Sequence, residues 1–382
     1  MAKVLRVGID ANPLAYPFRT GIGRYLESIL PYLAEAAGAQ AKFTLFAGKP
    51  IINQKALGLI ESGQARAVTV NAPSLYAWQQ SGMFLQYQFH RQDVYFSADG
   101  MFPPFTPGKA VGMYHDVLWA AHPETLARHI RYVFRMRHKA GLKRADAALT
   151  GTKASKDEML RVFGKVAGKL QVLPCYGVDM AHFRPLREDE SGQVDRFRLH
   201  FGLTEPFLLT AGNLQPHKNL AIVPQALDIL HRRGRDIPTL AVAGFGDQEA
   251  LQRSLPPGFP PEKVRTLGYL PEDDLCMAYR LALAYVFPSL YEGFGFPVVE
   301  AQASGAPVIY AEASSLPEVA GGAGINFDPT SPEDLARVID RVLGDEGLRK
   351  QMVARGFVHS AKFRWDTAGE TLWRVIRETA ES

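Results

Sequence analysis

The chain has 382 residues, of which 47% are hydrophobic, so it can bury a large core, and its length suggests two domains. Its net charge of +4 is unevenly distributed, since residues 1–185 hold 23 Lys and Arg against 12 Asp and Glu while residues 186–382 hold 20 against 27, and this imbalance suggests an anionic partner for the first half. Cys175 and Cys276 are far apart and lack metal-ligand spacing, so the sequence suggests neither a disulfide framework nor a zinc site, and a reducing cytoplasm is the expected location.

Short apolar runs alternate with helical patterns along the first half, as in a parallel sheet with crossover helices. We expect strands at Val4–Ile9, Phe43–Ala47, Ala67–Val70, Val94–Ser97, Ala110–Tyr114, Ala147–Thr150 and Leu170–Leu173. The first ten residues hold too short an apolar run for a signal peptide, and no stretch approaches the roughly 20 apolar residues of a membrane-spanning helix.

Two positions after these strands carry candidate ligand contacts, because open parallel sheets bind ligands outside the carboxyl ends of their strands. Asp10 follows the first strand and precedes the loop Thr20-Gly21-Ile22-Gly23-Arg24. Gly21 and Gly23 in this loop suit contact with phosphate or sugar hydroxyls, although two glycines also suit a tight strand-to-helix turn. His115-Asp116 follows the fifth strand.

A stretch without any acidic residue runs from Arg128 to Arg144. Its other cations are Arg131, Arg135, Arg137, Lys139 and Lys143. Apolar residues interleave with them, so one interpretation is a basic helix resting on anionic lipid headgroups. The other is a surface helix whose long basic side chains cover apolar neighbours. No recognised nucleic-acid-binding motif accompanies the stretch, and we expect no nucleic-acid partner.

The composition changes between the two halves. Residues 174–185 are rich in proline, glycine and aspartate and residues 187–195 are strongly charged, so we expect a linker and place the domains at residues 1–185 and 186–365. Residues 366–382 have the pattern of an amphipathic helix, and periodicity does not say on which domain it packs. The second domain has the strand pattern of another parallel sheet, with runs at Phe207–Ala211, Thr239–Ala243, Val264–Leu267, Ala284–Phe287 and Pro307–Tyr310.

Polar turns follow three of these second-domain strands. The first is Gly212-Asn213-Leu214-Gln215-Pro216-His217-Lys218-Asn219, the second Gly244-Phe245-Gly246-Asp247, and the third Gly268-Tyr269-Leu270. One interpretation of Lys218 is a surface lysine that flanks a helix. We expect His217 to be a solvated loop histidine.

Two carboxylates, Glu292 and Glu300, bracket a glycine-rich turn that leads into a helix. Pro297 suits the first helical turn because its missing N–H has no partner there, and Gly305 suits the helix end. Glycines in the turn let backbone amides approach a ligand closely, and helix starts attract phosphate. We therefore expect a sugar-nucleotide site. The alternative is that Glu300 only complements its helix dipole and Glu292 is a solvated turn residue.

In this order the residues resemble glycosyltransferase family 4, the retaining nucleotide-sugar glycosyltransferases of the GT-B fold. The strongest match is Ser289-Leu290-Tyr291-Glu292-Gly293-Phe294-Gly295-Phe296-Pro297-Val298-Val299-Glu300-Ala301, which carries the family's E-x7-E segment. Weaker matches are the early Gly-x-Gly loop, His115-Asp116, Gly177-Val178-Asp179 with Phe183-Arg184-Pro185, and the Gly-Asn-Leu-x-Pro-x-Lys-Asn turn. The resemblance covers nearly the whole chain. It implies an α/β fold of two Rossmann-like, doubly wound parallel-sheet domains that face each other across a cleft.

The resemblance also implies roles for the matched residues. Glu300 would bind the donor ribose and Glu292 the donor-sugar hydroxyls, which suits acceptor-only carboxylates. Lys218 would neutralise the diphosphate, and His115 would donate a hydrogen bond near the reacting centre. The rival interpretation of His115 is a core histidine paired with Asp116. Further donor contacts would come from Gly21, Gly23, Asn213, Phe245, Gly246, Leu270, Gly293, Phe294 and Gly295.

The chain departs from the family pattern at Asn213, where an arginine is common, so more of the phosphate charge would be met by Lys218, backbone amides and the helix dipole. No Asp-x-Asp occurs, and the pair Asp273-Asp274 is explained as an acidic helix start. The resemblance thus favours a metal-independent enzyme without a cofactor.

We therefore expect a retaining hexosyltransferase in the cytoplasm or on the inner face of its membrane. The expected donor is a nucleoside diphosphate sugar, GDP-mannose or GDP-rhamnose, and the expected acceptor is a saccharide or lipid-linked glycan in cell-surface polysaccharide synthesis. One alternative is a nucleotide-sugar 2-epimerase on the same scaffold. Another is a glycan-binding or scaffold protein without catalysis.

Overall fold

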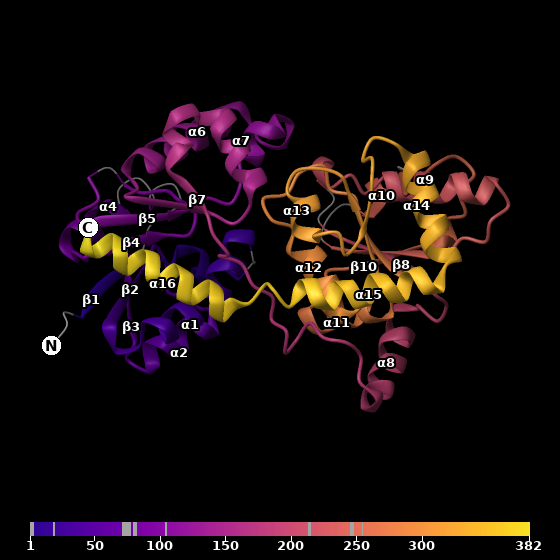
Figure 1. The fold of residues 1–382 in the computed structure, drawn as a ribbon, viewed down its shortest axis with the longest axis horizontal. Coiled ribbons are helices and arrows are strands. Elements are labelled where there is room, and N and C mark those ends of the chain that lie inside the picture. Colours follow the sequence, from indigo (N-terminus) through magenta and orange to yellow (C-terminus); the bar gives the residue numbers. More distant parts are fainter. Residues whose placement is uncertain are drawn as a thin grey trace. The chain divides into compact units, whose positions relative to one another are not determined.

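The structure is a computed structural model that describes residues 4–17, 20–70, 78, 82–103, 105–212, 215–244, 248–253 and 255–382. The chain divides into two compact units (Figure 1). Unit 1 comprises residues 1–177 and 364–382, and unit 2 comprises residues 178–363. The first crossing thus falls at Gly177 and Val178, before the expected boundary at 185, and the chain returns to unit 1 at Arg364.

Unit 1 contains a seven-stranded parallel sheet of order β3-β2-β1-β4-β5-β6-β7. Its strands are β1 (Leu5–Asp10), β2 (Ala41–Ala47), β3 (Ala65–Thr69), β4 (Val94–Ser97), β5 (Lys109–Met113), β6 (Ala147–Thr150) and β7 (Leu170–Val172). Its described α-helices are α1 (Gly21–Ala37), α2 (Gln54–Glu61), α4 (Met83–Phe89), α5 (Leu118–Ala121), α6 (Arg128–Arg144), α7 (Lys153–Phe163) and α16 (Trp365–Glu381). Short 3-10 turns are η1 (Asn12–Ala15), η2 (Gly38–Gln40), η4 (Pro123–Thr125) and η5 (Gly164–Lys169).

Unit 2 contains a six-stranded parallel sheet of order β10-β9-β8-β11-β12-β13. Its strands are β8 (Phe207–Ala211), β9 (Thr239–Ala243), β10 (Val264–Gly268), β11 (Ala284–Phe287), β12 (Val308–Ala311) and β13 (Ile325–Phe327). Its described α-helices are α8 (Ser191–Phe201), α9 (Ile222–Arg232), α10 (Gln248–Arg253), α11 (Glu272–Leu281), α12 (Phe296–Ser304), α13 (Leu316–Ala320), α14 (Pro332–Gly344) and α15 (Glu346–Ser360). The 3-10 turns are η6 (Glu188–Glu190), η7 (Pro216–Lys218) and η8 (Pro261–Lys263).

The C-terminal helix α16 packs on α1 in unit 1, which answers the question that periodicity left open (Figure 1). The two helices approach closely at Gly369, where a Cβ would come within 2.6 Å of the Tyr32 carbonyl carbon. Leu372 and Ile376 on the apolar side of α16 are fully buried. The last 19 residues are therefore part of the first unit's core, although they follow the second unit in the chain.

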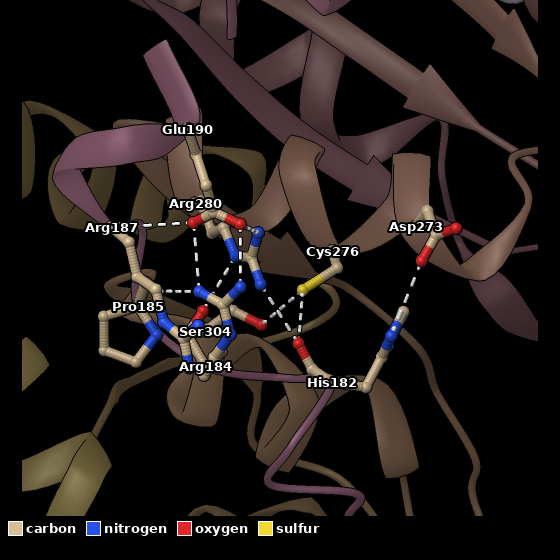
Figure 2. Close-up of polar contacts among 9 residues, drawn as sticks. All are labelled: His182, Arg184, Pro185, Arg187, Glu190, Asp273, Cys276, Arg280 and Ser304. Carbon is tan, nitrogen blue, oxygen red and sulfur yellow. Dashed lines mark hydrogen bonds and ion pairs between the residues drawn. The ribbon is translucent and has the colours of Figure 1, made fainter. Parts of the chain in front are cut away.

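The prediction that the charged residues 187–195 form a linker is wrong in detail, because much of this segment is helical. Residues 188–190 form a 3-10 turn and Ser191 begins α8. Glu190 is buried there beside Arg184 and Arg280 (Figure 2). A composition rich in charge indicates a linker only when those charges are solvated, and here one of them is paired.

A buried ion-pair network fastens the start of unit 2 to α11 (Figure 2). Arg184 donates to both carboxylate oxygens of Glu190, at 2.7 and 3.0 Å, and holds the pKa of Glu190 at about 2. Arg280 lies 3.5 Å from the same carboxylate and donates to the carbonyls of Arg184 and His182, at 2.8 and 3.1 Å. Cys276 also donates to the His182 carbonyl, at 3.1 Å. The segment that enters unit 2 is therefore held by side chains of one helix.

Candidate functional site

The site in unit 2 forms where the strand order of its sheet reverses. The chain continues from β8 to β9 on one side, and β11 lies on the other side of β8. Parallel strands bring their carboxyl ends to one edge, and ligands bind there at such a reversal. The turns after β8, β11 and β12 supply Lys218, Glu292 and the pair Ser314 and Ser315.

Lys218 and Glu292 form an ion pair at this edge. Lys218 Nζ donates to Glu292 Oε1 at 2.6 Å, and the two side chains are 18% and 15% exposed. The Lys218 ammonium also lies 5.8 Å from the centroid of the Phe287 ring. Glu292 is therefore a paired residue, which contradicts the alternative of a solvated turn carboxylate. Two opposite charges with limited solvent access can form charge-assisted hydrogen bonds with a polar ligand.

The turns that carry these two residues are joined through His217. The Leu290 N–H donates to the His217 carbonyl at 2.7 Å, and Ser289 Oγ donates to it at 3.3 Å. His217 is only 3% exposed, so the expectation of a solvated loop histidine is wrong. The hydrogen bonds to its carbonyl fix the separation of the Lys218 and Glu292 backbones.

Helix α12 begins as expected from the glycine turn and Pro297. Gly295 is the N-cap residue with a φ of 97°, a left-handed conformation that glycine adopts without strain, and Gly305 ends the helix. Glu300 is the fifth residue of α12 and is 2% exposed. The field of a helix end acts mainly within the first turn, and burial of a carboxylate is costly. A favourable interaction with the helix dipole alone therefore does not explain Glu300.

Two serines that the sequence pattern does not indicate hold the turn between Glu292 and α12. Ser315 Oγ, fully buried, lies 2.9 Å from the carbonyl oxygens of Glu292 and Phe294 and donates there, and Ser314 Oγ donates to the Glu292 carbonyl at 2.7 Å. Ser314 has a φ of 52°, uncommon for a residue with a Cβ. With these carbonyls occupied by the serines, the turn keeps one backbone conformation. In the sequence, only the position of the serine pair after a predicted strand pointed to this role. Serine is common in loops, so that position alone does not identify the pair.

Replacing Ser315 by alanine should weaken nucleoside diphosphate binding by about tenfold and lower stability by about 1–3 kcal/mol, because a buried donor to two carbonyls is lost. Calorimetric titration and chemical unfolding measure the two effects. Thr330→Val, which removes an exposed hydroxyl bonded to Asp328, is the matched control. Unchanged affinity in Ser315→Ala would contradict the role of Ser315 in holding the turn.

The ends of β8, β9 and β10 meet closely at glycines. Gly212 N donates to the Ala243 carbonyl at 2.9 Å, and Gly244 N donates to the Gly268 carbonyl at 2.7 Å. A Cβ on Gly244 would lie 1.8 Å from the Gly212 oxygen, so only glycine fits there. Leu270, which follows β10, is 6% exposed and buried. The candidates Asn213, Phe245 and Gly246 lie outside the described residues.

The candidates of unit 1 lie at the start of α1 and the end of β5. The side chain of Thr20 caps α1 by accepting from Gly23 N at 3.0 Å, and a Cβ on Gly23 would lie 3.3 Å from the Pro13 carbonyl oxygen. A Cβ on Gly21 would meet nothing within 4 Å. Tyr25, in the first turns of α1, meets the His115 ring edge-on at a centroid distance of 4.9 Å. Unit 1 thus brings the glycine turn and His115 close together.

Both ring nitrogens of His115 have partners. Nε2 lies 2.7 Å from the Ala98 carbonyl, so it carries the proton, and Nδ1 accepts from the Tyr176 hydroxyl at 2.6 Å. Asp116 instead accepts from the Leu118 N–H at 2.9 Å, so the expected rival pairing of His115 with Asp116 is not found. Burial lowers the pKa of His115 to about 4, and the ring is neutral at pH 7.

This lowered pKa predicts a pH-dependent contribution of His115 to stability. In the unfolded chain an ordinary histidine binds a proton below about pH 6.5, whereas folded His115 does so only near pH 4, so its contribution is lost as the pH falls between these values. The difference in unfolding free energy between the wild type and His115→Gln should shrink by up to about 3 kcal/mol over this range. Tryptophan fluorescence measures it, because all four tryptophans lie in unit 1. A constant difference would show that His115 titrates normally.

Comparisons with known protein sequences match unit 2 and nearly the whole chain. The family model described as glycosyl transferases group 1 matches residues 193–358, inside unit 2. The O-antigen chain mannosyltransferase B of Escherichia coli is 28% identical over 95% of this chain and 97% of its own length. The serotype-specific mannosyltransferase WbdA of Escherichia coli is 29% identical over 68% of this chain but only 32% of WbdA.

Solved structures share the fold of the whole chain. Anabaena Alr3699/HepE, in complex with UDP and glucose, has a TM-score of 0.74 at 17% identity and covers 98% of this chain and 100% of its own. WaaG, a glycosyltransferase involved in lipopolysaccharide biosynthesis, has a TM-score of 0.71 at 16% identity and covers 97% of this chain and 99% of its own. Residues 193–358 thus match the group 1 glycosyl transferases, and the whole chain has the GT-B fold and resembles O-antigen mannosyltransferases.

Proposed function

We propose that the chain transfers a mannosyl or rhamnosyl residue from a GDP-sugar to a saccharide or lipid-linked glycan in cell-surface polysaccharide synthesis, with retention of the α configuration. The observation that carries the transferase site is the Lys218–Glu292 ion pair beside the start of α12. The choice of mannose and of a glycan acceptor is supported by the full-length similarity to mannosyltransferase B.

In this proposal each residue of unit 2 serves one part of the donor. Glu300 accepts from the ribose hydroxyls and Glu292 from hydroxyls of the sugar. Lys218 and the amides that precede α12 bind the diphosphate, where positive charge stabilises the leaving group as the glycosidic bond breaks. These groups supply the charge without a metal ion. The acceptor hydroxyl attacks on the face that the diphosphate leaves, and the diphosphate takes its proton.

His115 is proposed to orient the acceptor side of the reaction rather than to act as a base. Its Nε2 proton is directed to the Ala98 carbonyl, and its pKa of about 4 keeps the ring neutral. A neutral ring held by Tyr176 cannot supply a full positive charge. Its Nε2 proton would reach the sugar only after the hydrogen bond to the Ala98 carbonyl is broken.

The donor is tested by a screen of GDP-, UDP-, ADP- and dTDP-sugars for binding and slow hydrolysis. We expect GDP-mannose or GDP-rhamnose to bind most tightly. Preference for UDP-glucose, the ligand of a HepE structure, would overturn the choice of base and sugar but not the transferase. Conversion of the donor to an epimer without release of nucleoside diphosphate would overturn the transferase.

We also propose that α6 binds the anionic cytoplasmic face of a membrane. The exposed cations of α6 are Arg128, Arg135, Lys139 and Lys143, which recur on one face of the helix. Tyr132 and Met136 on that face are 65% and 49% exposed. A cationic face with exposed apolar groups suits a headgroup layer better than it suits free solvent. No helix in the described part of the chain is both long and apolar enough to span a bilayer.

The structure changes which substitutions test this membrane proposal. Arg131 and Arg137 are only partly exposed, so reversing their charges would disturb packing as well as binding. Reversal of Arg135, Lys139 and Lys143 affects exposed cations alone. We expect it to reduce co-sedimentation with phosphatidylglycerol vesicles, since each cation near an anionic surface contributes about 1 kcal/mol.

A further inference from the structure

Three large apolar side chains are exposed together in unit 1 and have no role in the proposed donor site. Leu85 and Phe89 are one helical turn apart on α4 and are 47% and 76% exposed. Phe105 is 84% exposed, and its carbonyl accepts from Gln88 on the same helix at 2.9 Å. We call Leu85, Phe89 and Phe105 the apolar face.

The loop that presents Phe105 is held in place at several points. Thr106 Oγ1 donates to the Pro103 carbonyl at 2.8 Å, and Arg144, the last residue of α6, donates to the carbonyls of Thr106, at 2.9 Å, and Gly108. The exposure of Phe105 is therefore a property of an anchored loop. The same bonds place the apolar face beside the end of the basic helix α6.

The backbone of Phe105 is in a conformation that disfavours its own side chain. Its φ is 58°, in the left-handed region that glycine and asparagine occupy far more readily than phenylalanine does. A phenylalanine there is strained, and its exposed ring gains nothing from burial within the described part of the protein. Strain of this kind occurs preferentially at functional sites.

The charge around the apolar face is cationic. The exposed residue Arg91 follows Phe89 by two positions, and Lys143 precedes Arg144 on α6. Two nearby carboxylates are paired with arginines, Asp93 with Arg6 at 3.1 Å and Asp146 with Arg144 at 3.0 Å. We propose that the apolar face inserts into the interfacial layer of an anionic bilayer while these cations and those of α6 contact lipid headgroups. This inference rests on the proposal that α6 binds a membrane, and it names the side chains that enter the bilayer.

The test uses the full chain and vesicles of phosphatidylglycerol and phosphatidylcholine in equal parts, with phosphatidylcholine vesicles for comparison. Phe105→Asn is the sharpest variant, because asparagine suits a left-handed φ. It should leave the melting temperature unchanged or raise it while weakening binding to anionic vesicles by about tenfold. Phe89→Gln should weaken binding to a similar extent. Leu199→Gln on α8 of unit 2, also at a highly exposed apolar position, is the control and should bind like the wild type.

Each outcome decides between the two proposals. If the α6 charge reversal abolishes binding but Phe105→Asn and Phe89→Gln do not weaken it, the apolar face is not inserted and this inference is overturned. If the wild type does not bind vesicles and the same substitutions instead dissociate a dimer in sedimentation, the face contacts a second copy of the chain and both membrane proposals are overturned. Donor hydrolysis, measured in the same samples, should be unchanged in every variant, so failure of the transferase proposal is seen separately.

Discussion

Replacing Lys218 by alanine should lower kcat/KM for sugar transfer by a factor on the order of 10²–10³. The ammonium is the one cation that the site places directly on Glu292, at 2.6 Å, among the described residues. Its loss removes charge from the leaving diphosphate and leaves Glu292 without this partner in a partly desolvated position. Both kcat and affinity for the nucleoside diphosphate should fall, whereas affinity for the nucleoside should change little.

The matched control for this variant is Lys350→Ala. Lys350 also pairs with a glutamate of unit 2, Glu346, at 2.7 Å, but both side chains are exposed. This control should leave the rate within about twofold of the wild type, since exposed pairs contribute little. Glu292→Gln keeps the shape of the side chain. It should raise KM for the nucleotide-sugar donor by a larger factor than it raises Kd for the nucleoside diphosphate without the sugar. If Lys218→Ala loses no more activity than Lys350→Ala, Lys218 does not contact the donor.

Replacing Arg280 by methionine should destabilise unit 2 by about 3 kcal/mol, the lower end of the range for breaking a buried ion pair. Arg184 still neutralises Glu190 in this variant, but the carbonyls of Arg184 and His182 lose the Arg280 guanidinium, and Cys276 remains as a donor to His182 alone (Figure 2). Far-UV circular dichroism reports both units, whereas tryptophan fluorescence reports unit 1. The midpoint of chemical unfolding measured by dichroism should therefore be lower than in the wild type. The midpoint measured by tryptophan fluorescence should be unchanged.

Arg253→Met is the control for the Arg280 variant, because Arg253 pairs with Glu249 at 3.2 Å on the exposed surface of α10. It should change stability by less than about 0.5 kcal/mol. The double variant Arg280→Met with Glu190→Gln should be less unstable than the sum of the two single changes, since both remove one network. If the dichroism midpoint of Arg280→Met equals that of the wild type, the network does not contribute to the stability of unit 2.

The alternation of apolar runs and helices was enough to predict the architecture. All twelve expected strands are present, with ends shifted by at most two residues. The thirteenth, Ile325–Phe327, was not predicted, because three residues with a central asparagine carry too little periodicity. The packing of α16 on α1 also could not be predicted, since an amphipathic pattern shows that a helix buries one face but not against which partner.

The candidate site was predictable where a residue type is tied to local chemistry. Glu300 on its helix, the glycine N-cap and Lys218 after β8 follow from turn and capping rules. The Lys218–Glu292 pair joins residues 74 positions apart and needs the sheet order, which periodicity does not give. The same holds for Ser315 and for the Tyr176 hydroxyl on His115. The burial of His217 was missed because its ring occupies a packed position that a polar loop sequence does not indicate.

The central claim is that unit 2 binds a nucleotide sugar at Lys218, Glu292 and Glu300 and that the sugar is transferred. The most direct measurement is incubation of the wild type with GDP-mannose and a mannosylated glycan acceptor, followed by mass spectrometry and by NMR of the new anomeric centre. The account predicts one α-linked mannose added for each GDP released, with this product lost in Lys218→Ala and retained in Lys350→Ala. Release of GDP without transfer to any glycan, or an epimerised donor without GDP release, would contradict it.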